Sequence, residues 1–424
     1  MVRLCLPFFG LLFVLSLRGQ PASPPDVVTL DSAIQEAIRK NLDLAADKLN
    51  IPVAEAREIA ARLRPNPVLT IGGQTLNLLG ATYSPDTPLG PNQMNIHTDF
   101  PIERGHKREE RIALAKEQKT LTGLEVREAM RQIIYAVQSA FVDILQAKER
   151  LLLARENLRS LEGVVTINEA RLKNGDLAQV ELERSRLAAH QYRTSVQQAE
   201  LQLDQAKLQL QQLMGRKEGT AAFDVTGELR RDTLSSGREE IARMALEKRP
   251  DYLSGQQSQA ASRADLRLQL ANGKVDFVVG TEYTFQRAWG ISGSSMGVYF
   301  SMPLKIFNKN QGEIARAQRE INLAGARNEA LAARIRNEVD KAYRQYSVSS
   351  ELLANVESNM MGRARQVRDT TEYSYRRGEA SLIEFLDAQR AFNDAMVTLY
   401  EARANYARSL YWIDAVSGTS VSAF

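Results

Sequence analysis

The chain has 424 residues, 44% of them hydrophobic, and its 55 basic and 51 acidic residues leave a net charge of +4. That length exceeds a typical single domain, so we expect two domains or one duplicated unit. The charges are nearly balanced and interleaved, which gives nucleic-acid binding little support. The three histidines are not paired at metal-ligand spacing, and there is no phosphate-binding glycine loop or nucleophile elbow. We therefore predict that the protein is not an enzyme and uses no metal or cofactor.

The first residues have the pattern of a secretory signal peptide, which we place at residues 1–22. Arg3 supplies the positive charge, residues 4–17 form a 14-residue apolar stretch, and cleavage is expected after Ala22. Cys5, the only cysteine, lies in this segment and too early for lipidation, so we expect no disulfide and no lipid anchor in the mature chain. No later run approaches 18 apolar residues, so a membrane-inserted mature chain would have to use a β-barrel.

Two long stretches of the sequence read as helical hairpins. No proline lies between Pro101 and Pro250 or after Pro303, and both stretches are rich in Ala, Leu, Glu, Gln and Arg. Each is interrupted once, at Gly175 and at Gly378, by a glycine that follows basic residues, which is typical of a helix end. We predict helices over 104–173 and 177–214, and over 309–376 and 380–417. A helix of roughly 70 residues would be on the order of 100 Å long.

The returning arms of both hairpins carry a heptad repeat. In the first arm the two core positions hold Leu182, Ala189, Val196, Leu203 and Leu210, and Ser185, Tyr192, Ala199, Ala206 and Leu213. In the second arm they hold Phe385, Phe392, Leu399, Tyr406 and Ile413, and Ala388, Ala395, Ala402, Ser409 and Val416. This repeat predicts coiled-coil packing with a left-handed supercoil. Ordinary amphipathic helices in a soluble bundle are the alternative, which the proline-free length makes less favoured.

The two hairpins belong to a duplicated unit. The same 203 residues separate Gly175 from Gly378 and Gly215 from Gly418, and 202 separate Pro101 from Pro303. A constant offset between landmarks of different kinds indicates two equivalent halves. We predict a first repeat at 23–216, a linker at 217–237, a second repeat at 238–418 and a C-terminal tail at 419–424.

A pair of strands is expected before each hairpin, over 68–79 and 93–102 and over 275–286 and 295–304. Phe277, Val279 and Thr281 alternate with Val278 and Gly280, and such segments of about ten residues match strands that span a membrane. Four strands cannot close a barrel, since about eight is the practical minimum. The chain must therefore oligomerise, or its strands form a soluble sheet; the export signal and the apolar strand faces favour lipid. His97, on the polar face, is interpreted as an isolated polar residue.

Several segments resemble the TolC-type outer-membrane efflux proteins. Residues 301–317 (SMPLKIFNKNQGEIARA) and their first-half counterpart 99–112 look like the strand-to-helix corners of that family, 377–388 like its hairpin tip, and 30–44 like its N-terminal helix. The similarity extends over about 28–418. It implies an α+β, mostly α, fold in which three chains form a 12-stranded barrel continued by a coiled-coil tunnel in the periplasm.

The resemblance also implies a function. The protein would be a passive exit duct in the outer membrane of a Gram-negative bacterium, in contact with outer-membrane lipid and with a large periplasmic portion. Its partners would be a periplasmic adaptor and an inner-membrane pump of the resistance-nodulation-division type. Residues 103–108 resemble the heavy-metal branch, which favours metal cations over drugs. The alternatives are an adaptor, which carries one hairpin instead of two in tandem, and a soluble coiled-coil scaffold.

In this family, acidic and tyrosine side chains close the tunnel at the hairpin tips. The matching gate residues here are Tyr375, Glu384, Asp387, Glu181 and Asp176. The tips expected to dock the adaptor hold Asn174, Gly175, Arg377, Gly378 and Glu379. Ala380 occupies the position where the family has a basic residue that latches the gate. Arg376 or Arg377 could supply that basic side chain instead. Without the resemblance, these carboxylates would be interpreted as a solvated helix face. If three copies place them around one axis, they predict an acidic constriction that selects cations.

Overall fold

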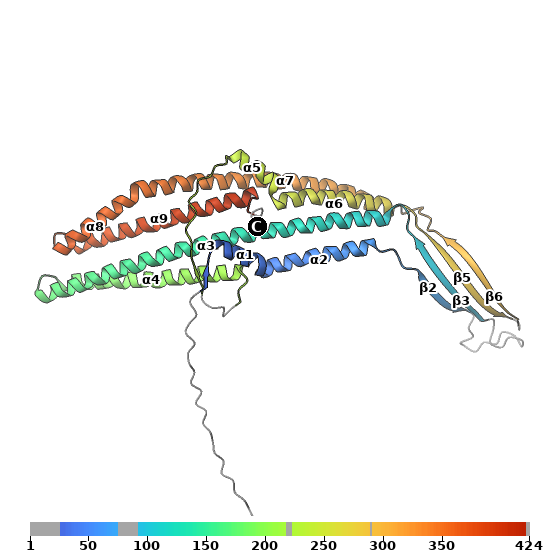
Figure 1. Cartoon of the computed structure of the whole chain (residues 1–424), viewed down its shortest axis with the longest axis horizontal. Coiled ribbons are helices and arrows are strands. Elements are labelled where there is room, and N and C mark those ends of the chain that lie inside the picture. The colour runs from blue at the N-terminus through green and yellow to red at the C-terminus, as the bar shows by residue number, and fades with distance from the viewer. Residues whose placement is uncertain (1–25, 75–91, 218–222, 289–290, 421–424) are drawn as a thin grey trace, which may run out of the picture.

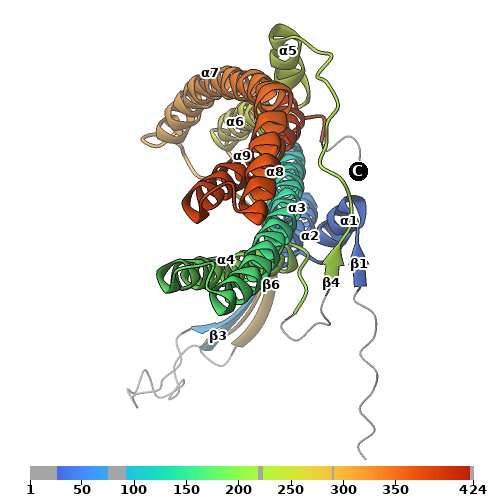
Figure 2. The ribbon, with the colours of Figure 1, turned by 90° about the vertical axis from the view of Figure 1, so that its left-hand side faces the viewer.

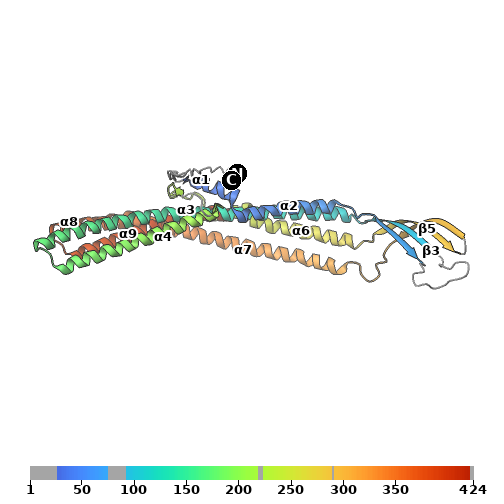
Figure 3. The ribbon, with the colours of Figure 1, turned by 90° about the horizontal axis from the view of Figure 1, so that it is seen from below.

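The computed structural model describes residues 26–74, 92–217, 223–288 and 291–420, and shows an elongated molecule (Figure 1). A small β-sheet lies at one end and two helical hairpin tips lie at the other (Figures 1 and 3). The predicted signal peptide, residues 75–79 of the first predicted strand and residues 421–424 of the tail lie outside the described residues. The protein is therefore mostly helical with a small sheet.

The elements follow the same order in both halves of the chain. The first half contains β1 (Asp26–Val28), α1 (Leu30–Lys40), α2 (Leu42–Arg62), β2 (Val68–Gln74), β3 (Asn92–Ile102), α3 (Lys107–Asn174) and α4 (Gln179–Leu213). The second half contains β4 (Phe223–Val225), α5 (Arg238–Lys248), α6 (Pro250–Asn272), β5 (Phe277–Ala288), β6 (Ile291–Ser301), α7 (Gln311–Asn355), α8 (Met361–Arg377) and α9 (Leu382–Ser417).

The long helices change partners halfway along their length. Helix α3 packs against α4 toward the tip and against α2 and α6 toward the sheet (Figures 1 and 3). The prediction of one helix over 30–44 was wrong, because Asn41 separates α1 from α2. The Asn41 side chain accepts a hydrogen bond from the Leu44 amide and donates one to the Leu213 carbonyl, both 2.9 Å long, so it begins α2 and ties it to the end of α4.

The predicted heptads face the interior. All ten heptad residues of α9 are buried, and all ten of α4 are buried or half-buried. Leu182, Phe385 and Tyr375 belong to or border one apolar cluster near the tips, and Ile413 belongs to another near the middle of the molecule. Burial of these side chains is the driving force that holds the hairpin arms together.

The second outgoing helix is not uniform. We expected one helix over 309–376, but a five-residue π-helix at Val356–Met360 separates α7 from α8. A π-turn inserts an extra residue and shifts which side chains face inward, and the helix bends between α7 and α8 (Figure 1). Glu357 in this turn pairs with Arg403 of α9 at 2.7 Å, which holds the insertion against the returning arm.

The four strands form one antiparallel sheet in the order β2-β3-β5-β6. Its register places Ile71, Ile96, Tyr283 and Met296 in one row, so apolar side chains share one face and polar ones the other. Strand β6 lies about four residues before the predicted 295–304. Pro303 has no amide hydrogen to donate, which is consistent with the end of the ladder at Ser301.

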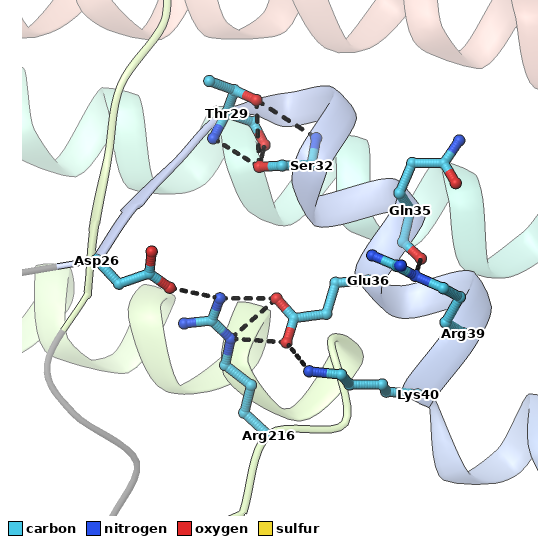
Figure 4. A network of polar contacts seen from close by, with 8 residues as sticks. All are labelled: Asp26, Thr29, Ser32, Gln35, Glu36, Arg39, Lys40 and Arg216. Atoms are coloured by element: carbon cyan, nitrogen blue, oxygen red, sulfur yellow. Dashed lines mark hydrogen bonds and ion pairs between the residues drawn. The ribbon is translucent and has the colours of Figure 1, made fainter.

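A small polar junction ties the chain together near its middle. Strand β1 pairs in parallel with β4, which lies in the predicted linker (Figure 2). Beside them, Arg216 contacts Glu36 at 2.7 Å and Asp26 at 2.9 Å, and Lys40 contacts Glu36 at 3.0 Å (Figure 4). Partial burial raises the pKa of Glu36, but hydrogen bonds from Arg216 and Lys40 outweigh this effect and leave the pKa below its ordinary value of 4.5.

We expect Arg216→Gln to lower the free energy of unfolding by about 2 kcal/mol at neutral pH, since it removes charged hydrogen bonds from a half-buried carboxylate. A carboxylate with a lowered folded-state pKa stabilises the fold above pH 4.5 and loses that effect as the pH falls through the lowered value. The difference in the free energy of unfolding between the variant and the wild type should therefore be constant from pH 7 to about pH 5 and shrink below about pH 4. Thermal unfolding at each pH measures it, and Arg243→Gln, which breaks only an exposed pair with Glu247, is the control. A constant difference down to pH 3 would contradict the assignment.

Candidate functional site at the hairpin tips

Both hairpin tips turn at a glycine in the left-handed conformation. Gly175 has φ 85° and Gly378 has φ 83°, a region that non-glycine residues rarely adopt. After each glycine the next amide donates back into the helix, from Asp176 to the Arg171 carbonyl and from Glu379 to the Ser374 carbonyl, both at 2.9 Å. These bonds are local, so the sequence around each glycine is sufficient to end the helix there.

The residues predicted to dock an adaptor are exposed. Asn174, Gly175 and Asp176 are exposed at the first tip, and a Cβ atom added at Gly175 or Gly378 would meet open space. At the second tip Arg377 donates to the Tyr373 hydroxyl at 2.8 Å and pairs with Glu379 at 3.1 Å. The tips therefore offer backbone and charged side chains to whatever approaches them.

Tyr375 lies between the two hairpins. Its side chain is 2% exposed, its ring stacks on Phe385 at 5.3 Å, and its hydroxyl donates to Asn168 Oδ1 at 2.7 Å. Arg171 donates to the carbonyls of Tyr375 and Arg376 at 3.2 and 2.7 Å. Burial raises the pKa of Tyr375, so its hydroxyl keeps its proton at neutral pH. Helices α3 and α8 are thereby joined at the tips.

Of the predicted acidic gate residues, Glu181 lies near enough to Tyr375 for its charge to raise the pKa of the tyrosine further, whereas Glu384 and Asp387 have other partners. The Glu384 carboxylate accepts from the amide (2.7 Å) and the hydroxyl (2.9 Å) of Ser381, a capping box at the start of α9. Those bonds lower the pKa of Glu384. Asp387 is exposed and lies 3.6 Å from Arg390, whereas Glu181 is half-buried. Ala380 packs against the apolar cluster below Tyr375, where a basic side chain would lose its hydration.

Sequence reasoning missed the polar groups that join the hairpins. Besides Asn168 and Arg171, a buried seam contains Asn157, Gln389 and Asn393, linked by two hydrogen bonds of 2.8 Å. The Nδ2 of Asn168 and the Oε1 of Gln389 are buried without a partner in the described part of the chain. Asn157 and Asn168 are eleven residues apart, about three helical turns, and so lie on one face of α3. That spacing is the signal that could have identified them.

The polar face of the sheet holds a second set of charged groups. His97 lies on the polar face, as predicted, and its Nε2 is 3.8 Å from Glu282 Oε1 across the β3–β5 pair. The Tyr299 hydroxyl donates to Asp99 on the same face. Within the described ranges, no group of three or more His, Cys, Asp or Glu side chains is placed to hold a metal ion.

None of the helices in the described residues is long and apolar enough to span a membrane.

Comparison with known proteins assigns the family. The family model described as "Outer membrane efflux protein" matches residues 33–216 and 241–419, which is most of the chain. The protein belongs to the outer membrane efflux protein family. Members of this family are transport channels and not enzymes, they work with adaptor and inner-membrane pump partners, and the homotrimer is typical of them.

Curated relatives and solved structures agree with this assignment. The cobalt-zinc-cadmium resistance protein CzcC of Cupriavidus metallidurans is 27% identical over 401 residues, 91% of this chain and 87% of the relative. The pyoverdine export outer membrane protein OpmQ of Pseudomonas putida is 25% identical over 415 residues, 89% and 82% of the two chains. The fold is that of CusC (TM-score 0.75, 17% identity, 95% of each chain) and of the Campylobacter jejuni outer membrane channel CmeC (TM-score 0.76, 15% identity, 92% of this chain and 86% of that one).

As a family member, the protein is an efflux channel of the outer membrane with a periplasmic portion. The prediction of function and location is confirmed, and the adaptor and soluble-scaffold alternatives are not favoured.

Proposed function

We propose that three copies of this chain form a 12-stranded barrel in the outer membrane, continued by a helical tunnel in the periplasm. The apolar face of the four-stranded sheet is the observation that carries this proposal. Strands β5 and β6 have 12 and 11 residues. At about 3.4 Å per residue and a tilt of about 40°, they rise roughly 30 Å, enough to cross the hydrocarbon layer. Strands β2 and β6 are the edges of the sheet, each paired on one side only among the described strands, and three copies would pair these edges around a ring.

Exposed apolar stripes along the helices also support a ring. On α4, Val180, Leu187, Leu201 and Leu208 are 57, 60, 58 and 63% exposed, and all four fall on one seven-residue series. In the other hairpin, whose helices α7 and α8 lie away from α4 (Figure 2), Val348 and Val367 are 63 and 52% exposed. If one side of each copy contacts the unlike side of the next copy, both stripes become buried. Such head-to-tail contacts form a ring that closes after a fixed number of subunits.

We expect Leu187→Lys with Leu201→Lys to prevent assembly, because each buried leucine contributes about 1.5–3 kcal/mol and a lysine placed there must lose its hydration. The mass of the protein in detergent measures this, with the trimer falling to one chain. Gln191→Lys with Gln198→Lys adds the same charge at exposed positions of the same helix outside the stripe and should leave the trimer intact. A trimer of unchanged stability in the first variant would count against the proposed interface.

We further propose that the tips form the gate and select metal cations delivered by an adaptor and a resistance-nodulation-division pump. Asp387, Glu181 and Asp176 lie near the tips without a buried cation partner among the described residues, and three copies would arrange them in rings. Glu384 contributes its negative charge to the gate while it also caps α9. Tyr375 holds the two hairpins together at the gate. The exposed tips at Asn174, Gly175, Arg377, Gly378 and Glu379 are offered to the adaptor. Similarity to CzcC favours a metal cation as substrate.

Asp387→Asn should lower the preference for cations and shift the reversal potential toward zero by several millivolts, since it removes three charges from a narrow ring. The measurement is the reversal potential across a planar bilayer under a salt gradient. Asp394→Asn removes an exposed charge seven residues further along α9 and is the matched control. Equal shifts in both variants, or none in either, would show that the tip does not set selectivity. Glu384→Gln keeps the cap and isolates the effect of its charge.

A further inference from the structure

We propose that the margin of the sheet nearest the helices binds the headgroups of anionic phospholipid in the inner leaflet of the outer membrane. Four connections form this margin, at residues 63–67, 103–106, 273–276 and 302–310. Their cations are Arg64, Arg104, Lys274, Lys305 and Lys309, which we call the basic collar. The inference rests on the proposed barrel, because it requires the strands to lie in lipid.

The acids in these connections are already neutralised. Glu103 pairs with Arg111, and Asp276 pairs with Lys107 at 2.5 Å, so both carboxylates are taken by side chains of α3. Lys305 Nζ donates to the carbonyls of Asn272 and Lys274 at 2.5 and 3.0 Å. The side chains of the other four collar residues form no ion pair within 4.0 Å in the described part of the chain, although the backbone amide of Arg104 donates to Asp276 Oδ1 at 2.8 Å. Glu109, the exposed acid nearby, lies 3.9 Å from His106.

Apolar side chains extend from the strand into the collar. Every second residue from 296 to 306 is apolar and exposed: Met296 (80%), Val298 (75%), Phe300 (60%), Met302 (49%), Leu304 (71%) and Ile306 (66%). Phe307, which follows, is 89% exposed. The series thus continues past the end of β6 at Ser301 and alternates with Lys305 before it reaches Lys309.

This combination matches the boundary between hydrocarbon and headgroups. Apolar and aromatic side chains enter the acyl region there, while Lys and Arg contact phosphate. A second copy of the chain could cover Phe307, but it offers no acid from these connections that is not already paired. At the opposite end of the strands, the described residues contain one cation, Arg287, so the positive charge is concentrated on the helical side. The inner leaflet is the surface that meets this side.

The experiment uses the assembled full chain in vesicles with a single fluorescent label. Because Cys5 is the only cysteine and lies in the predicted signal peptide, Phe307→Cys gives one label in the mature chain. Phosphatidylglycerol and phosphatidylcholine, each brominated on its acyl chains, are compared as quenchers. We expect quenching by both, with phosphatidylglycerol preferred at least about fivefold, because each cation near an anionic surface contributes about 1 kcal/mol. Lys274→Gln with Lys309→Gln should lower this preference about fivefold or more, and leave only the part that Arg64, Arg104 and Lys305 provide.

Controls separate this inference from the barrel proposal. Arg319→Gln with Lys341→Gln removes two exposed cations of α7 and should leave the preference unchanged. A label at Val298→Cys should be quenched equally by both lipids, and one at Gln318→Cys by neither. Suppose the label at position 298 is quenched, while the label at position 307 is either not quenched or shows no lipid preference. The collar then does not bind anionic lipid, but the barrel proposal is unaffected. If Val298 is unquenched, the barrel proposal and this inference both fail.

Discussion

Asn168→Ala is expected to loosen the tips and raise the open probability of the channel roughly 5- to 150-fold. The Tyr375 hydroxyl is buried and its observed partner is Asn168 Oδ1, so the variant leaves a buried donor unpaired. Such a group costs about 1–3 kcal/mol. Separation of α8 from α3 would relieve that cost by letting water reach the hydroxyl, so the balance shifts toward the open state. Single-channel recording in planar bilayers measures the open probability, and it tests the proposed role of Tyr375 as a latch.

A double variant distinguishes a lost latch from a damaged fold. Asn168→Leu with Tyr375→Phe replaces both polar partners by apolar groups, which can be nearly neutral for stability. The stacking contact with Phe385 would remain. We expect this variant to gate like the wild type, with the same trimer mass as the single variant. If Asn168→Ala gates normally, Tyr375 is a packing residue and the gate lies with the exposed acids.

Gly215→Ala should destabilise the protein by several kcal/mol. Gly215 has φ 69°, and a Cβ atom there would lie 2.6 Å from the Lys40 carbonyl carbon and 3.1 Å from the Asn41 nitrogen. These are backbone atoms, so the contact cannot be relieved by a side-chain rotation. A backbone shift at Gly215 moves the end of α4 away from Asn41. It breaks the hydrogen bond from the Asn41 side chain to the Leu213 carbonyl and disturbs the neighbouring contacts of Arg216 (Figure 4).

Gly175→Ala is the matched control, because Gly175 also has positive φ but open space around it. Left-handed backbone alone costs an alanine roughly 1–2 kcal/mol. Apparent unfolding midpoints at one heating rate compare the two variants, and the difference between them reports the clash at Lys40. Equal midpoints would mean that the junction between α1, α2 and α4 relaxes freely.

Much of the architecture was predictable from the sequence because it depends on local patterns. Gly175 and Gly378 end their helices through bonds to residues three to five positions earlier, and the heptads of α4 and α9 select their own buried faces. The alternation of β3, β5 and β6 likewise depends only on the period of a strand. These features need no information from distant parts of the chain.

Contacts between distant residues were not predictable in this way. The sequence alone determined two long hairpins, four strands with one apolar face and the glycine turns. Tertiary packing decided that Tyr375 points at Asn168, 207 residues away, that Glu282 faces His97, and that Asn41 binds the Leu213 carbonyl at the end of α4. A helix pattern states which face is buried but not which helix covers it. For that reason the exposed apolar stripes and the basic collar became visible only when the neighbours of each side chain were known.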